Sequence, residues 1–205
     1  MHRTEDEIRA LLVIGHGRDQ GLGHALLETV REALEERSIP VRVHDLLADG
    51  FDPVLRLATG QAHPGRVSAG EDPIAHGYQE DATWANLFVF VHPVWWFAPP
   101  AILKGWIDRI FVDGVAVKQI EGGTPEGLLH GKRALVVQTF NTNRMVDRVV
   151  FSNITGTFWR KAVCLATGLK LLQRVPIYGA AKLDETSVAA HQKHLRKVLS
   201  HQIKG

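Results

Sequence analysis

Short apolar runs alternate with amphipathic stretches along this chain of 205 residues, and this alternation constrains the fold more than any other feature. A strand buried on both faces of a parallel sheet is apolar throughout, whereas a covering helix has an apolar residue every third or fourth position. The apolar runs predict strands at residues 9–15, 41–44, 87–92, 134–138 and 170–175. The amphipathic stretches predict helices from Leu22 onward and at 101–111, 149–165 and 184–203, the last capped by Asp184 or Thr186. The sequence therefore predicts an α/β fold with a five-stranded parallel sheet between two layers of helices.

Two long stretches, residues 46–74 and 112–130, hold most of the glycine, proline and histidine. Neither separates two complete sets of strands and helices, so we interpret both as loops of one domain that spans residues 1–205.

Composition limits the kinds of partner. The chain has 24 basic and 22 acidic residues, a net charge of +2, which gives no reason to expect binding to nucleic acid or to anionic membranes. No apolar run approaches the ~18 residues of a membrane span. The first seven residues are polar and acidic, unlike a signal peptide, and Cys164 is the single cysteine. We expect a cytoplasmic protein without membrane insertion.

Ligands of an open parallel sheet bind beyond the carboxyl ends of its strands, where the strand order reverses. For five strands in the order 2-1-3-4-5, that point lies between the first and the third. The loops after these strands, with the loop after the fourth, are therefore where a site is expected.

The loop after the first strand, Gly15–His24, is rich in glycine, contains His16 and Arg18, and precedes a helix. Backbone N–H groups at a helix N-terminus suit a phosphate. Gly15, Gly17 and Gly21 are spaced one residue too far apart for the dinucleotide fingerprint, and no Walker A loop is present. The alternative is a flexible turn with incidental glycines; phosphate binding is the interpretation we favour.

The loop after the third strand reads His-Pro-Val-Trp-Trp-Phe-Ala-Pro-Pro, residues 92–100. Three successive aromatic residues cannot all face one core, so some of them must point elsewhere. Prolines stiffen the loop, and large rings cost little entropy to hold still. Core filling is the alternative for any single tryptophan, but the pattern favours a wall for a flat, fused-ring ligand.

Residues 92–111, HPVWWFAPPAILKGWIDRIF, resemble the flavodoxin-like NAD(P)H:quinone oxidoreductase family of the DT-diaphorase type, whose pattern there ends in PAILKGWIDRVF. Leu11–His24 is similar to the first strand and phosphate loop of that family, with His16 at its histidine position. Residues 46–53 are similar to its DLYAEGFDPV segment. The resemblance covers most of the chain and implies a flavodoxin-like three-layer sandwich with strand order 2-1-3-4-5.

The resemblance also implies a homodimer that binds FAD or FMN, oxidises NAD(P)H, and passes two electrons to a quinone or similar small-molecule acceptor in a ping-pong cycle. It places His16, Gln20, Gly21, Leu22 and Gly23 around the flavin phosphate. It places Pro93, Val94, Trp95, Trp96 and Phe97 along the isoalloxazine, and Thr139, Phe140, Asn141 and Thr142 at its pyrimidine edge. Asn141 and Thr142 are the candidate catalytic donors near N1/O2, where negative charge grows on reduction.

This chain departs from the family at two of these loops. Gly21-Leu22-Gly23 stands where the family has Ser-Phe-Asn, so phosphate binding would depend on backbone amides, His16 and Arg18. Residues 139–143, TFNTN, are closer to a bacterial subgroup with an Asn-Thr-Ser-Asn run. The long 112–130 stretch could supply adenine contacts, which favours FAD over FMN.

Two other functions stay open. One is a flavin-binding regulatory subunit, for example of a potassium-efflux antiporter. The other is a dehydrogenase that binds NAD(P) directly, with Asp45 as the ribose-binding acid. No metal site is expected, because His191, His194 and His201 on the last helix have no completing ligand set. The absence of a GxSxG motif leaves hydrolase chemistry unsupported.

Overall fold

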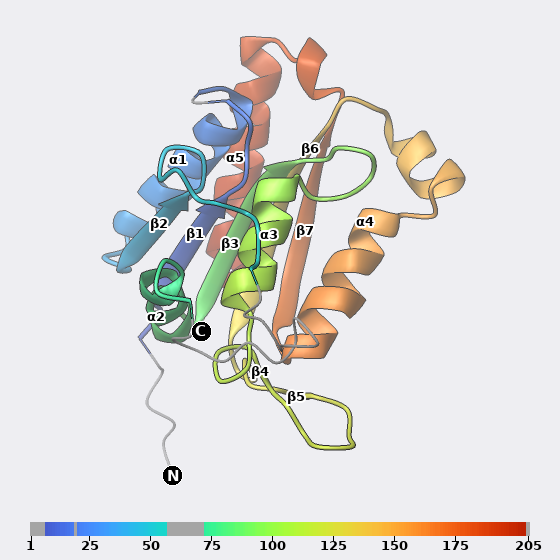
Figure 1. Cartoon of the computed structure of the whole chain (residues 1–205). Helices are drawn as coiled ribbons and strands as arrows, with labels where there is room; N and C mark the ends of the chain where they lie inside the picture. The colour runs from blue at the N-terminus through green and yellow to red at the C-terminus, as the bar shows by residue number, and fades with distance from the viewer. Residues whose placement is uncertain (1–6, 19, 57–71, 204–205) are drawn as a thin grey trace.

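The computed structural model describes residues 7–18, 20–56 and 72–203. Its centre is a parallel sheet of five strands in the order β2-β1-β3-β6-β7 (Figure 1). The strands are β1 (Ala10–Ile14), β2 (Val41–Asp45), β3 (Leu87–Pro93), β6 (Arg133–Phe140) and β7 (Lys170–Tyr178). Counting only the strands of this sheet, the order is 2-1-3-4-5, and the expected flavodoxin-like topology is confirmed.

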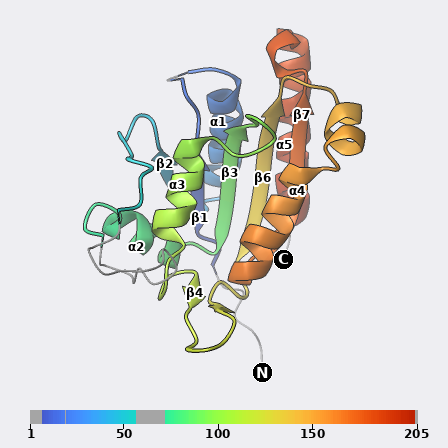
Figure 2. The same cartoon turned by 45° about the vertical axis from the view of Figure 1, so that its right-hand side comes forward.

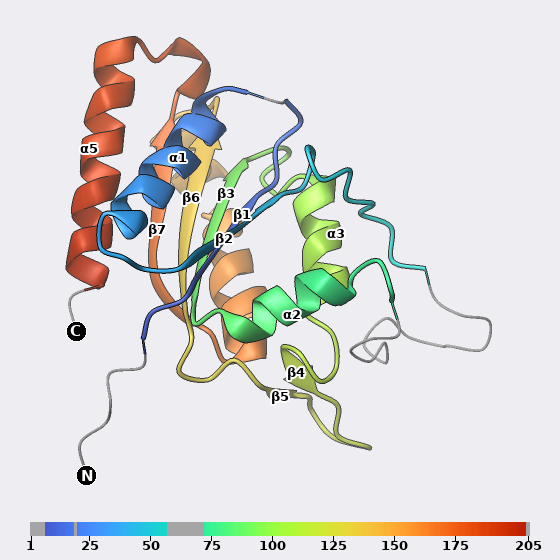
Figure 3. The ribbon, with the colours of Figure 1, turned by 90° about the vertical axis from the view of Figure 1, so that its left-hand side faces the viewer.

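Helices cover both faces of the sheet and complete a three-layer sandwich (Figure 3). Helices α1 (Leu22–Glu35) and α5 (Glu185–Gln202) pack on one face. Helices α2 (His76–Trp84) and α3 (Ala101–Ile110), with α4 (Ile154–Thr157) and its continuation Phe158–Leu165, pack on the other. Figure 2 shows α3 and α4 crossing this second face.

Alternate residues of each strand enter the two cores, which explains why the strands are apolar throughout. Leu11 and Val13 of β1 face α3, whereas Leu12 and Ile14 face α1. Strand β3 divides in the same way, with Phe88 and Phe90 packed near Trp106. Burial on both faces is the property that made these strands recognisable in the sequence.

Helix α2 is not among the helices expected from the sequence. Its sequence, HGYQEDATW, buries only Gln79 and Ala82, so it lacks the apolar stripe of a typical amphipathic helix. Its C-terminal carbonyl groups are instead bonded from outside the helix. Lys132 Nζ donates to the carbonyls of Ala82 (3.2 Å) and Thr83 (2.6 Å), and Arg9 Nε donates to Trp84 O (2.8 Å).

Two other expectations need correction. The helix expected at 149–165 begins at Val146 and is interrupted at 151–153, where Ser152 and Asn153 both have positive φ. The segments on either side, Val146–Val150 and Phe158–Leu165, have the wider π-helical turn. Within the stretch interpreted as a loop, β4 (Val117–Lys118) and β5 (Glu126–Gly127) pair as a short antiparallel hairpin.

A buried ion pair and an adjoining hydrogen bond connect α3 to segments that precede α2. Arg109 donates from Nε to Asp72 Oδ2 (2.7 Å) and from Nη2 to Asp72 Oδ1 (2.9 Å), and its Nη1 donates to Asp52 O. The Arg109 side chain is almost completely buried, so removal of either partner would leave an unpaired charge in the interior.

Candidate functional site

A pocket of about 230 Å³ lies at the carboxyl ends of β1, β3 and β6. The strand order reverses between β1 and β3, which is where ligands of such sheets bind. The loops after β1, β3, β6 and β7 form its wall, with His16, Gly17, Arg18, Gly21, Leu22, Pro93, Val94, Trp95, Thr139, Asn141, Ala180 and Ala181 as lining residues. Segments distant in sequence therefore converge at the expected place.

The glycine-rich loop presents the N-terminus of α1 to this pocket. Gly21 precedes the helix with a φ of 147°, in the region that favours glycine. Among the described residues no side chain caps the helix, and its first turn contains no acidic residue. The N–H groups of the first turn are therefore free to bind an anion, and the positive end of the helix dipole favours one.

His16 lies between this loop and the body of α1. Gly23 accommodates its ring, because a Cβ at position 23 would be 3.2 Å from His16 Cδ2. Burial, then His24 and Arg18, lower the pKa of His16 below its ordinary value of 6.5, so the neutral imidazole predominates at pH 7. Its Nδ1 is buried and has no hydrogen-bond partner in the described part of the chain. A buried polar atom of this kind fits a polar group of a ligand.

The aromatic loop after β3 forms a tight turn that exposes its tryptophans. Trp95 N donates to Ala98 O (3.1 Å), and Ala98 N donates to Trp95 O (3.0 Å). The two residues between them, Trp96 and Phe97, have positive φ values of 50° and 55°. Such values at both central positions favour asparagine and glycine, so two aromatic residues are unusual there.

The three aromatic side chains have different surroundings. Trp95 is 51% exposed and lies over Gly17, whose backbone approaches the indole closely. Trp96 is 99% exposed. Phe97 stacks on Phe151, with ring centroids 3.5 Å apart. The expectation that some of these rings must point away from the core is confirmed.

The loop after β6 completes the pocket and is tied to its neighbours. Val94 N donates to Thr139 O (2.8 Å), and Gly179 N donates to Thr142 O (3.2 Å). Asn141 is exposed and lines the pocket, whereas Phe140 is buried and packs on Tyr178.

The structure therefore separates the expected cofactor residues into two sets. Those that line the pocket are His16, Gly21, Leu22, Pro93, Val94, Trp95, Thr139 and Asn141. Those that do not are Gln20, Gly23, Trp96, Phe97, Phe140 and Thr142. Flavin contact by any of them stays a prediction.

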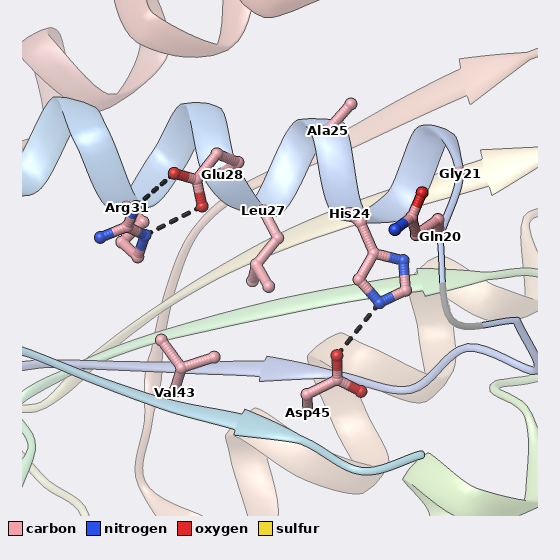
Figure 4. A pocket seen from close by; sticks show the side chains of 9 residues that line it. All are labelled: Gln20, Gly21, His24, Ala25, Leu27, Glu28, Arg31, Val43 and Asp45. Atoms are coloured by element: carbon pink, nitrogen blue, oxygen red, sulfur yellow. Dashed lines mark hydrogen bonds and ion pairs between the residues drawn. The ribbon is translucent and has the colours of Figure 1, made fainter. Parts of the chain in front are cut away.

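Gln20 lies in a neighbouring groove of about 510 Å³ between α1 and the edge strand β2 (Figure 4). Gly21 lines both this groove and the first pocket. In the groove, His24 Nε2 lies 3.1 Å from Asp45 Oδ2, and Arg31 pairs with Glu28. Asp45, the residue considered for ribose binding, thus already has a histidine partner.

A buried polar cluster behind the pocket was not predicted from the sequence. Trp159 Nε1 lies 3.2 Å from His92 Nε2, which must therefore accept, so that His92 Nδ1 carries the proton and donates to Pro93 O (2.7 Å). Gln138 Nε2 also lies 3.2 Å from His92 Nε2. Burial lowers the pKa of His92 to about 4. The available signal was a histidine at the end of an otherwise apolar strand.

A second missed cluster supports the loops after β6 and β7. Tyr178 Oη donates to Asp147 Oδ2 (2.7 Å), and Arg174 Nη2 lies 3.5 Å from the same oxygen. Arg174 Nη1 also donates to Thr155 Oγ1 (2.6 Å). Asp147 is completely buried, which its position in a polar stretch of sequence does not reveal.

Comparison with known proteins decides the family. A family model described as a flavodoxin-like fold matches residues 9–201. The chain belongs to this flavodoxin-like family. The pocket lies at the strand-order reversal, as expected for a ligand site of this type of sheet.

Three similar proteins add detail. A ribosyldihydronicotinamide dehydrogenase-like protein of Penicillium crustosum is 32% identical over 64% of this chain and 57% of its own length. The ribosyldihydronicotinamide dehydrogenase (quinone) of Pongo abelii is 29% identical over 73% of this chain and 70% of its own length. The crystal structure of Smu.1420 from Streptococcus mutans UA159 is 28% identical, covers 95% of this chain and 98% of its own, and has a TM-score of 0.75. The chain thus spans little more than half the length of the first of these relatives.

Among the described residues, no group of three or more histidine, cysteine or carboxylate side chains could hold a metal ion. In the same part of the chain, no helix is both long and apolar enough to cross a membrane.

Proposed function

We propose that this protein is a flavin-dependent oxidoreductase that takes a hydride from NAD(P)H and passes two electrons to a quinone or a similar acceptor. The observation that supports it most is the pocket between the free N-terminus of α1 and the exposed Trp95, at the strand-order reversal of a flavodoxin-like sheet. The names of the dehydrogenase relatives point to the same class of reaction.

The residues present fit a flavin by two features. The uncapped first turn of α1 and the unpartnered Nδ1 of His16 suit a phosphate. The backbone of Gly17 lies against the Trp95 indole, so that a side chain at position 17 would fill this part of the pocket. The pocket of about 230 Å³ is smaller than the ~300–1,000 Å³ of typical whole-ligand sites, so a flavin would extend beyond it toward the exposed Trp96.

The flavin would supply the two-electron chemistry, and the protein binds and orients it. The N-terminal turn of α1 would hold the phosphate. Trp95 and Pro93 would bound one side of the ring, which excludes water from it. Asn141 would place a polar group near the pyrimidine edge, where negative charge grows during reduction. NAD(P)H and the electron acceptor would both approach the flavin ring from its open side. We therefore propose a ping-pong order, in which NAD(P)+ leaves before the electron acceptor enters.

We also propose a homodimer. Met145, Val149, Val150 and Ile154 form an exposed apolar patch, with exposed fractions of 72%, 72%, 66% and 53%. Phe151 adjoins this patch and stacks on Phe97 of the aromatic loop. Exposed apolar surface beside a ligand pocket favours a protein interface, and a second copy would add a further wall beside the site.

The test begins with the purified protein. We expect yellow protein, release of FAD or FMN on denaturation identified by mass spectrometry, and oxidation of NADH or NADPH that depends on a soluble quinone. Colourless protein that still oxidises NAD(P)H would contradict the flavin proposal and favour direct NAD(P) binding. Bound flavin without turnover would favour the regulatory-subunit alternative.

The dimer is tested separately by sedimentation velocity. Val149→Glu together with Ile154→Glu should convert a dimer to a monomer, while Lys161→Glu, at an exposed lysine of the adjoining helical segment, should not. A wild-type monomer at micromolar concentration would contradict the proposal. The cytoplasmic location stays a prediction.

A further inference from the structure

A large pocket lies at the opposite end of the sheet from the candidate flavin site. Its volume is about 930 Å³, and it forms where the amino ends of β1, β6 and β7 meet the end of α5. This volume lies within the ~300–1,000 Å³ typical of small-molecule sites. Nothing in the proposed redox function uses it.

Four cationic side chains line this pocket: Arg9, Lys132, Arg133 and Lys170. None of them forms an ion pair with a carboxylate in the described part of the chain, although Arg31, Arg109 and Arg196 do so elsewhere. The carboxylate among the lining residues is that of the exposed Glu7. Positive charges that have no carboxylate partner among the described residues repel one another at a partly buried site, and an anion would relieve that repulsion.

Two of these side chains are held in place with donors to spare. Lys132 Nζ uses two of its three N–H groups on the carbonyls of Ala82 and Thr83. The Arg9 guanidinium uses Nε on Trp84 O, and its two terminal nitrogens have no hydrogen-bond partner among the described residues. The end of α2 thus fixes both cations, and fixed donors lose little entropy when they bind a ligand.

The titration of Lys132 agrees with this geometry. Burial, and then the charge of Arg9, lower the pKa of its amine from 10.5 to about 8. An anion bound beside the amine would raise that pKa, because it would stabilise the protonated form.

We propose that this pocket binds the phosphate group of a small phosphorylated molecule through Arg9, Lys132, Arg133 and Lys170. Arginine and lysine donors together match the several oxygens of a phosphate. Ile8 and Ile203 add apolar wall for the remainder of the ligand. A single concave site in a protein with a net charge of +2 fits a small anion better than a polyanion.

Isothermal titration of the purified protein with inorganic phosphate and with ribose 5-phosphate tests the proposal, at pH 7 and constant ionic strength set with sodium chloride. Arg133→Ala with Lys170→Ala should weaken binding at least about tenfold, because two charge-assisted contacts are lost. Neither side chain has a hydrogen bond within the described part of the chain, and the backbone bonds of the two residues, to Asn86 O and Lys132 O, are kept in the variant. The fold should therefore persist, as circular dichroism would verify.

Arg18→Ala is the matched control, because it removes an exposed cation from the candidate flavin site instead. It should leave phosphate affinity at the second pocket unchanged. If Arg18→Ala weakens binding and the double variant does not, the anion binds at the α1 loop and the proposal is wrong. Heat no different from that of added chloride would also overturn it. Flavin is present at saturating concentration in every titration, so that a phosphate site at the α1 N-terminus is occupied and the measured heat reports binding elsewhere.

Proton uptake provides a second measurement. At pH 8 the Lys132 amine is about half protonated, so phosphate binding should take up a fraction of a proton. Titrations in two buffers with different ionisation enthalpies measure that uptake. Binding without uptake would remove Lys132 from the proposed site, and uptake that persists in Lys132→Met would assign it to another group.

Discussion

The indole of Trp95 lies against the backbone of Gly17, so closely that a Cβ at position 17 would be 2.9 Å from Cη2 of the ring. The contact joins the loop after β1 to the loop after β3, across the point where the strand order reverses. It fixes the width of the candidate flavin pocket.

Gly17→Ala should therefore narrow the pocket. The new methyl group would displace the indole, and we expect flavin affinity of the apoprotein to fall about tenfold, which is about 1.4 kcal/mol. Fluorescence quenching during flavin titration measures this. The control is Gly77→Ala in α2, where a Cβ would meet no atom within 4 Å. Equal flavin affinity in wild type and Gly17→Ala would show that this contact does not shape the site.

The turn at Trp96 and Phe97 stores backbone strain at the edge of the same pocket. Trp96→Asn should raise the free energy of unfolding of the apoprotein by about 1 kcal/mol, because asparagine tolerates positive φ and the exposed indole contributes no packing. Urea denaturation measures this. Trp96→Ala removes the ring but keeps the strain, so its stability should stay near that of wild type. Both variants should bind flavin more weakly if the ring contacts it; unchanged affinity in both would contradict that contact.

His16 should make binding of a flavin phosphate pH-dependent. Its pKa lies below 6.5 in the free protein, and a bound phosphate would raise it, so binding takes up a proton. FMN affinity should therefore increase as the pH falls from 8 toward 6.5. Riboflavin, which lacks the phosphate, should show no such increase, and His16→Asn should remove it for FMN. An FMN affinity that is flat over this range would exclude His16 from the phosphate site.

His92 should make the fold sensitive to acid. Its pKa is about 4 in the folded protein and about 6.5 in the unfolded chain, so the unfolded state binds the extra proton between these values. Its contribution to stability is complete above pH 6.5 and declines by up to about 3 kcal/mol as the pH falls to 4. Urea midpoints from pH 7.5 to 4.5 should fall less steeply in His92→Gln than in wild type. The matched control is His191→Gln on α5; parallel slopes in all three proteins would refute this role.

Arg109→Ala should be among the most destabilising single substitutions. It leaves Asp72 as an unpaired, largely buried carboxylate, and we expect a loss of about 3–5 kcal/mol. Arg196→Ala, which breaks an exposed pair with Glu32 and Glu36, should cost less than about 1 kcal/mol. Thermal unfolding of the two variants side by side provides the measurement. Comparable losses of stability would mean that the buried ion pair of Arg109 stabilises the fold no more than the exposed pair of Arg196.

The sequence by itself determined the sheet. Strands such as Leu87–Pro93 are apolar on both faces, and only a strand covered by helices on each side requires that, so the pattern is legible without any tertiary knowledge. For the cap of the last helix the sequence left two candidates, Asp184 and Thr186, and the structure selects Asp184, which accepts from Ser187 N (2.8 Å). The surface pair of Lys104 and Asp108 follows from helical spacing alone.

Only the tertiary structure decided which side chains meet. Helix α2 has no apolar stripe, so its own residues give no strong helical signal. Its last carbonyl groups accept hydrogen bonds from Lys132 and Arg9, which lie far from it in sequence. The partner of Gly17 is an indole from another strand's loop, and the partner of His92 is Trp159, 67 residues away. Periodicity records which face of an element is buried, whereas contacts between loops and buried polar groups depend on how the whole sheet brings its strand ends together.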